Sequence, residues 1–198
     1  MPILVVVVAC SSERETQPAR TASEQLMISS AVDHALDRLH VDIPRGTRIW
    51  VNADNFEGYD QKYAVGAIRD HLLRQGALLV ADKGQADTIV EIRSGALSTD
   101  ENSMLIGIPS MALPVPFVGA TSTPELSLLK RSNEKGVAKI GVTAYDAKTG
   151  AMAPYSPAQP AYGFSDRTRW VVFSLIDWSN SDTLPENVED ESGADEGK

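Results

Sequence analysis

The sequence has little cysteine and little positive charge. Cys10 is the one cysteine among 198 residues. A single thiol can form neither an internal disulfide nor a metal site built from several cysteines. The 18 Lys and Arg are outnumbered by 27 Asp and Glu, which gives a net charge of −9. Because phosphate binding requires clustered Lys and Arg, this composition argues against nucleic acid as a partner.

Sequence motifs for phosphate binding and nucleophilic catalysis are also missing. A Gly-x-Ser-x-Gly elbow does not occur, and the stretch Gly136–Lys139 precedes a strand, which is the wrong context for a phosphate-binding loop. The three histidines, His34, His40 and His71, have no second ligand at metal-binding spacing. We therefore expect no catalytic residue, no metal site and no cofactor.

One group of carboxylates keeps an enzymatic alternative open. Asp54, Glu57 and Asp60 follow the predicted strand Thr47–Ala53, at the end of a strand where α/β folds often place active sites. A small periplasmic enzyme would use them if one carboxylate lay in a closed pocket with a perturbed pKa. The interpretation that we favour is a polar loop in which Asp60 caps a helix.

The N-terminal residues resemble a lipoprotein signal. Met1–Ala9 is apolar but too short to cross a membrane as a helix. Val7-Val8-Ala9-Cys10 resembles the bacterial lipobox, in which the cysteine is diacylated and becomes the new N-terminus. The positively charged segment of a secretory signal is missing, so either the natural start lies upstream or this is no signal. The alternative is a buried first strand with an inert thiol at Cys10, in a cytosolic protein.

Length and composition predict one folded unit with polar flanks. With 42% hydrophobic residues, the chain can bury one core. We expect a signal remnant at 1–10, a polar linker at 11–20 and a single α/β domain at 21–180. The acidic tail at 181–198 has almost no aromatic or branched aliphatic residue and is predicted to be disordered.

Hydrophobic periodicity predicts the elements of this domain. Asp87–Leu97 and Gly136–Asp146 alternate in side-chain type, as strands with one buried face do. Thr21–Glu24 has the pattern of a capping box that opens a helix, and a second helix is expected to run from Asp60 to Gln75. The expected buried stripes of the two helices are Ile28, Ala31, Val32, Ala35, Leu36 and Leu39, and Ala64, Ile68 and Leu72. Shorter strands are predicted at Thr47–Ala53, Ala77–Ala81, Ala161–Phe164 and Arg169–Ile176. The predicted fold class is α/β (α+β), with a single mixed sheet of about five strands backed by two helices.

A long apolar insertion, Thr99–Lys130, separates the two main strands. Its four prolines exclude a central strand or a helix interior, and its apolar content is unlike that of a solvated loop. We expect either that it folds over its own sheet edge or that it contacts a partner, a second copy or a membrane. The candidate residues for a partner or oligomer contact are Ile106, Ile108, Met111, Leu113, Val115, Phe117 and Val118.

Several stretches resemble an uncharacterised family of bacterial outer-membrane lipoproteins. These stretches are Thr21–Leu26, Ala86–Glu91 with Gly95, Leu128–Arg131 leading to Val137–Lys139, and Ala144–Asp146 with Thr149-Gly150. More distantly, the strand–insertion–strand pattern looks like a group of periplasmic domains that includes the curli secretion lipoprotein, the Pel polysaccharide lipoprotein and the lipoprotein activators of penicillin-binding proteins. This resemblance implies an anticodon-binding-like α/β sandwich that binds proteins or assembles rings.

The sequence thus predicts a non-catalytic binding or assembly module. It would be anchored through a lipid on Cys10 to the periplasmic face of the outer membrane, where Ser11 after the cysteine directs such lipoproteins. Its expected partners are the membrane, through that lipid, and an envelope protein or further copies of itself.

Overall fold

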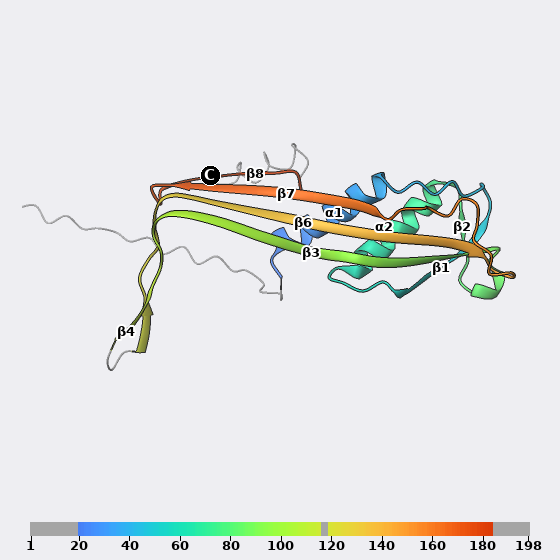
Figure 1. The fold of residues 1–198 in the computed structure, drawn as a ribbon, viewed down its shortest axis with the longest axis horizontal. Helices are drawn as coiled ribbons and strands as arrows, with labels where there is room; N and C mark the ends of the chain where they lie inside the picture. The colour runs from blue at the N-terminus through green and yellow to red at the C-terminus, as the bar shows by residue number, and fades with distance from the viewer. Residues whose placement is uncertain (1–19, 116–118, 184–198) are drawn as a thin grey trace, which may run out of the picture.

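The computed structural model describes residues 20–115 and 119–183. Within these ranges the chain forms a six-stranded sheet with two helices on one face and a separate two-stranded ribbon (Figure 1). This is the expected α+β fold with a single mixed main sheet, which has one strand more than predicted. The elements are α1 (Ala22–Asp37), β1 (Arg48–Asn55), α2 (Gln61–Arg74), β2 (Leu78–Leu79), a 3₁₀ turn (Lys83–Gln85), β3 (Thr88–Ile108), β4 (Ala112–Val115), β5 (Gly119–Ser122), β6 (Leu126–Asp146), β7 (Ala161–Val172) and β8 (Ile176–Ser181).

Two very long strands form the middle of the main sheet. The strand order is β2-β1-β3-β6-β7-β8, with β1 parallel to β2 and β3 and the other neighbours antiparallel. β3 and β6 have 21 residues each and pair from Thr88 opposite Asp146 to Ile108 opposite Leu126. Buried side chains on β3 end at Leu97. Farther out, β3 and β6 continue beside β7 and β8 to the end of the sheet, where the chain bends and the ribbon with β4 projects away from the body (Figure 1). We call these outer parts of β3 and β6, together with β4 and β5, the arm.

Both helices form as their local sequence predicts. Thr21 Oγ1 accepts a hydrogen bond from the backbone N–H of Glu24, whose carboxylate in turn accepts one from the Thr21 N–H, so the capping box is confirmed. The predicted stripes of both helices are buried. Asp60 precedes α2 as predicted, but its side chain makes no capping hydrogen bond and its backbone is left-handed, with φ of 54°.

The insertion is not the loop that its prolines predict. β3 extends into it from one side and β6 from the other, and β4 pairs with β5 between them. Pro109 follows the last residue of β3, and Pro124 lies two residues before β6, so both prolines stand outside the long strands. Pro114 lies in β4, which has one partner strand, and proline is tolerated at such an edge.

The predicted final strand, Arg169–Ile176, is also wrong. It covers the end of β7, a turn and the start of β8, and the predicted brief strand Ala161–Phe164 is the first part of β7. The turn places Phe173 and Ser174 in the left-handed conformation, with φ of 49° and 53°. Because neither residue is a glycine or asparagine, sequence patterns for turns do not detect it.

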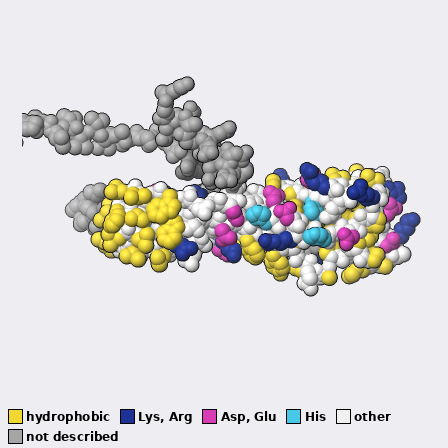
Figure 2. All heavy atoms as spheres, turned by 90° about the horizontal axis from the view of Figure 1, so that it is seen from above, with side chains coloured by type: hydrophobic (Ala, Val, Ile, Leu, Met, Phe, Trp, Pro, Cys, Tyr) yellow, Lys and Arg dark blue, Asp and Glu magenta, His cyan; other side chains and the backbone are white. Residues whose placement is uncertain are grey.

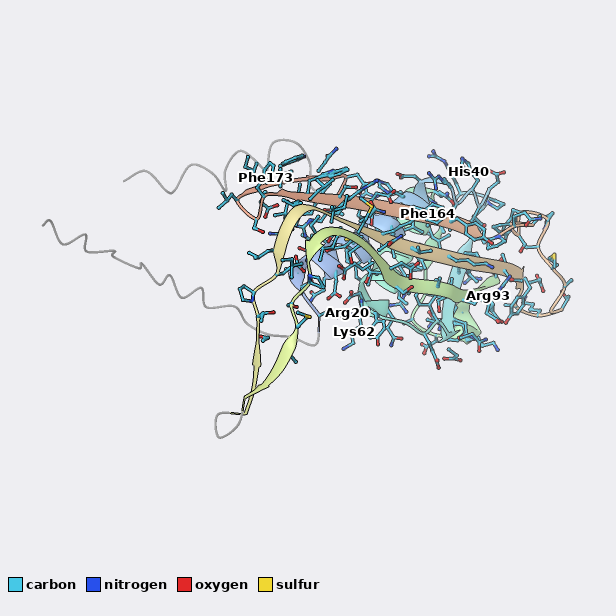
Figure 3. All side chains as sticks on the ribbon, turned by 60° about the vertical axis from the view of Figure 1, so that its left-hand side comes forward. Arg20, His40, Lys62, Arg93, Phe164 and Phe173 are labelled. Carbon is cyan, nitrogen blue, oxygen red and sulfur yellow. The ribbon has the colours of Figure 1, made fainter. Side chains whose placement is uncertain are left out.

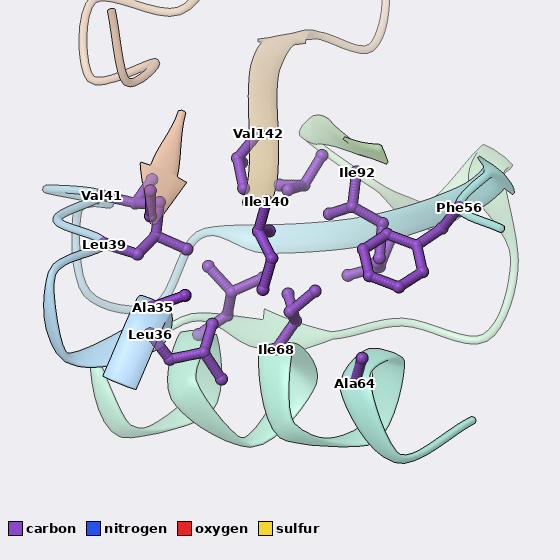
Figure 4. Close-up of a cluster of buried hydrophobic side chains, with 14 of the residues drawn as sticks. Ala35, Leu36, Leu39, Val41, Phe56, Ala64, Ile68, Ile92, Ile140 and Val142 are labelled. Carbon is purple, nitrogen blue, oxygen red and sulfur yellow. The ribbon is translucent and has the colours of Figure 1, made fainter. Parts of the chain in front are cut away.

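The core lies between the two helices and the inner halves of the strands. Figure 4 shows Ile68 of α2 and Leu36 of α1 pointing toward Ile92 and Ile140 of the sheet, all of them buried. Alternate residues of β6, from Ala138 to Ala144, supply much of this layer. The alternation that predicted the two central strands therefore marks the face that the helices cover.

Helix α1 lies unusually close to the sheet. A Cβ atom built on Gly163 of β7 would stand 1.8 Å from the carbonyl oxygen of Ala31, and one on Gly136 of β6 would stand 2.5 Å from that of Met27. Between them, the buried Ser165 hydroxyl donates a 2.7 Å hydrogen bond to the same Met27 carbonyl. Small residues on the strands thus allow the helix backbone to touch the sheet.

Two side chains, His34 on α1 and Arg38 just after it, hold the edge of β7 that β8 leaves uncovered. Arg38 donates a 2.8 Å hydrogen bond to the carbonyl of Tyr162, and His34 Nδ1 lies 2.6 Å from that of Phe164. β8 pairs with β7 from Arg167 onward. Since free strand edges promote association with other strands, these two contacts protect the inner part of this edge.

Candidate functional site

The most distinctive surface of the described residues is apolar and lies at the junction of the arm with the outer end of β7. Figure 2 shows hydrophobic side chains gathered at one end of the molecule, with the charged side chains over the rest of this view. We call this surface the apolar end. Its members are Met104, Ile106, Ile108, Met111, Leu126, Leu128, Phe173, Leu175, Ile176 and Trp178, and all of them are exposed. Monomeric proteins rarely expose a continuous apolar surface of this size without a partner for it.

Hydrogen bonds join the turn after β7 to β6 and make this surface continuous. The Phe173 N–H donates to the carbonyl of Leu128 at 3.0 Å, and the Ser127 N–H donates to the Ser174 hydroxyl at 2.8 Å. Figure 3 places Phe173 at the outer end of the sheet, far from His40. This turn has a strained left-handed backbone at Phe173 and Ser174. It holds apolar side chains in water, since Leu175 is 87% exposed.

A narrow belt of aromatic and charged side chains lies where the apolar end borders the body, and Trp178 belongs to both. Trp170 and Trp178 stack with ring centroids 6.3 Å apart, and the guanidinium of Arg131 lies 5.0 Å from the Trp170 ring centroid. Arg169 donates hydrogen bonds to Asp177 and thereby lowers the pKa of that carboxyl.

Only some of the contact residues predicted from sequence lie within the described residues. Ile106, Ile108 and Met111 are exposed and belong to the apolar end, while Leu113 and Val115 lie on β4. Phe117 and Val118 lie outside the described residues, and so does Cys10 with the rest of the proposed lipobox. Sequence reasoning missed the contribution of Phe173, Leu175, Ile176 and Trp178. The apolar run Arg169–Ile176, which does not alternate, was the available signal.

The carboxylates considered for an enzyme differ in exposure and partners. Asp54 and Glu57 are exposed. Asp60 lies 3.7 Å from the guanidinium of Arg20, which stacks 3.5 Å from the ring centroid of Tyr59. Asp60 therefore joins the chain before α1 to the start of α2.

A groove of about 570 Å³ runs between α1 and α2. Tyr63 and Asp33 line it, and the Tyr63 hydroxyl donates to both carboxylate oxygens of Asp33, at 2.9 and 2.8 Å. Desolvation of the phenol, followed by the Asp33 hydrogen bond, raises the pKa of Tyr63 to about 12. His71, also on the groove, has its Nε2 2.8 Å from the carbonyl of Leu39, a structural contact rather than a metal ligand.

The raised pKa of Tyr63 predicts a late step in the titration of the tyrosines. Because folding favours the neutral phenol, this contribution to stability is complete below the ordinary pKa of 10 and is lost as the pH rises through about 12. Ultraviolet difference titration should show this step in the parent protein and not in Tyr63→Phe. Asp33→Asn should lower the pKa of Tyr63 but not to the ordinary value of 10, since the phenol stays desolvated. An unchanged titration curve in Asp33→Asn would contradict the role given to the Asp33 hydrogen bond.

Among residues 20–115 and 119–183, no His, Cys, Asp or Glu side chains gather in a group of three or more that could hold a metal ion. In the same ranges, no helix has the length and apolarity that are needed to cross a membrane.

Comparison with known proteins places the chain among uncharacterised sequences. Residues 7–172 match the model of a family described as "Family of unknown function (DUF6655)". The match spans well over half of the chain, from the proposed lipobox to the end of β7. No curated protein matches the sequence.

Proposed function

We propose that this chain, which belongs to the DUF6655 family, is a lipid-anchored cell-envelope protein that acts as a non-catalytic binding and assembly module. Cys10 carries the lipid, 11–20 form the tether, and the protein stands on the periplasmic face of the outer membrane. Its contact surface is the apolar end, including Ile106, Ile108 and Met111. The observation that carries the proposal is the exposure of this continuous apolar surface at one end of a folded body.

The described residues favour binding over catalysis. Asp60 pairs with Arg20, whereas Asp54 and Glu57 are exposed. In the groove between the helices, Tyr63 pairs with Asp33, Arg74 pairs with Asp70, and His71 contacts a backbone carbonyl. The apolar end, by contrast, is built from three parts of the chain that are far apart in sequence. Such a surface offers shape and apolar area, which are properties of an interaction site.

The lipid anchor is tested by mass spectrometry of the protein made in a Gram-negative host from a gene with its upstream region intact. We expect a diacylglyceryl-modified N-terminus at Cys10 and recovery in the outer-membrane fraction. In Cys10→Ala both should be lost. An unmodified chain that begins at Met1 would contradict the anchor and the location, and it would restore the cytosolic and enzymatic alternatives.

The contact role of the apolar end is tested by photo-crosslinking in intact cells. A photoreactive amino acid at position 175 should form adducts with an envelope component, because Leu175 is 87% exposed on this surface. The control position is Leu78 of β2, which is 52% exposed at the opposite end of the molecule (Figure 1). Equal adduct yields at both positions would contradict a specific contact surface.

A further inference from the structure

We propose that the component contacted by the apolar end is the lipid bilayer itself, so that this end is a second membrane attachment. This inference deepens the proposed function, and it takes the location in the cell envelope from that proposal. The physical argument uses the described residues alone. Three features carry it: the order of side-chain types along the molecule, the pairing of the charges next to the apolar end, and the position at which the N-terminal segment joins α1.

The side chains follow the order found where proteins enter a membrane interface. Exposed apolar residues such as Phe173 and Leu175 lie at the outer end of β7 and β8. The stacked Trp170 and Trp178, with Arg131 beside them, come next, and the charged body follows (Figure 2). Tryptophan is enriched at the level of lipid headgroups, because its ring is apolar and its N–H is polar, and arginine binds lipid phosphates there.

The charges in the belt are compatible with a headgroup layer. Two acidic groups next to the apolar end are paired within the protein, since Glu125 accepts hydrogen bonds of 2.9 and 3.1 Å from Lys130, and Asp177 accepts from Arg169. Arg131 is exposed, and its guanidinium contacts an aromatic ring rather than a carboxylate. Arg131, Arg169 and Asp177 together thus carry one net positive charge, although the chain as a whole has a charge of −9.

The proposed lipid anchor joins the fold on the side that faces the apolar end. Ser23, at the start of α1, accepts a 2.7 Å hydrogen bond from Arg167, whereas Arg38, just after the helix, reaches Tyr162. The start of α1 therefore lies nearer to Val172, the last residue of β7. The five residue-to-residue steps of strand from Arg167 to Val172 span about 17 Å, and the ten steps from Cys10 to Arg20 can span about 33 Å. Both attachments can therefore meet the same surface.

The apolar end enters the membrane only to a shallow depth. Among the described residues, β3 is paired on the β1 side only as far as Arg93, and β4 and β5 pair only with each other. Backbone groups along these edges need water, and hydrocarbon would leave them unsatisfied. The apolar side chains therefore enter the headgroup region and the top of the acyl layer, while the strand edges stay hydrated.

The test uses the full chain with Cys10→Ala, so that no lipid anchor contributes. Trp50→Phe leaves the two belt tryptophans as the fluorophores. With vesicles of phosphatidylethanolamine and phosphatidylglycerol, we expect flotation of the protein, a blue shift of its emission and quenching by brominated acyl chains. Leu175→Asp should weaken partitioning of the protein into the vesicles at least about tenfold, because a charged group takes the place of a leucine side chain that enters the membrane. The control Leu78→Asp should leave partitioning unchanged.

Both positions are exposed, so circular dichroism should show that both variants remain folded. The proposal is overturned if the chain fails to float with vesicles, or if both variants float as the parent does. It is also overturned if sedimentation without vesicles shows a stable dimer that Leu175→Asp dissociates, since a second copy would then cover the apolar end. Because Cys10 is absent from all these proteins, a failure here is distinct from a failure of the lipid anchor.

Discussion

Gly163→Ala is expected to destabilise the protein by roughly 3 kcal/mol, whereas Gly66→Ala is expected to stabilise it by up to about 1 kcal/mol. The two variants make the same chemical change. At Gly163 the new methyl group would stand 1.8 Å from the Ala31 carbonyl and 2.4 Å from the Ala35 nitrogen, both backbone atoms of α1. A side chain could rotate away, but the helix can only move as a whole and would lose its contact with the sheet.

Gly66 provides the matched control because it lies in the middle of α2, and a methyl group there meets nothing within 4 Å. Alanine is favoured over glycine by the entropy of the unfolded chain. Urea unfolding of the two variants and the parent measures both effects in one experiment. Equal shifts in the two midpoints would show that α1 does not depend on a close approach at Gly163.

The second large effect is expected for Ile140→Ala, which should cost about 2 to 5 kcal/mol. Ile140 is fully buried on β6 and faces both helices (Figure 4). Removing three carbon atoms leaves a cavity there, because the surrounding helices and strands can close it only in part.

Ile106→Ala deletes the same atoms on the arm and is expected to cost less than about 1 kcal/mol. Ile106 is 51% exposed, so little apolar burial is lost. Equilibrium unfolding of both variants compares a core position with an arm position. If Ile106→Ala were as costly as Ile140→Ala, the arm would belong to the core, and the insertion would serve to cover the sheet edge rather than to contact a partner.

The sequence by itself determined the elements whose patterns depend on a few neighbouring residues. The capping box of Thr21 and Glu24 sets the start of α1, and the apolar spacing of both helices identifies their buried stripes. The alternation in Asp87–Leu97 and Gly136–Asp146 marks the helix-covered face of the sheet, because a strand exposes alternate residues to opposite faces. The fold class followed from these elements, since each of them must bury one face.

Only the tertiary structure decided how far the strands extend and which apolar residues stay in water. Along the arm, β3 and β6 are strands because each supplies the other with hydrogen-bond partners, and hydrophobic alternation does not record this pairing. The apolar end combines the arm with the turn at Phe173, and the hydrogen bonds that join them link residues about 45 positions apart in the chain. Gly163 likewise has no room for a side chain only because α1 lies against it. Contacts between distant segments depend on the packed whole, which is why no local pattern predicted them.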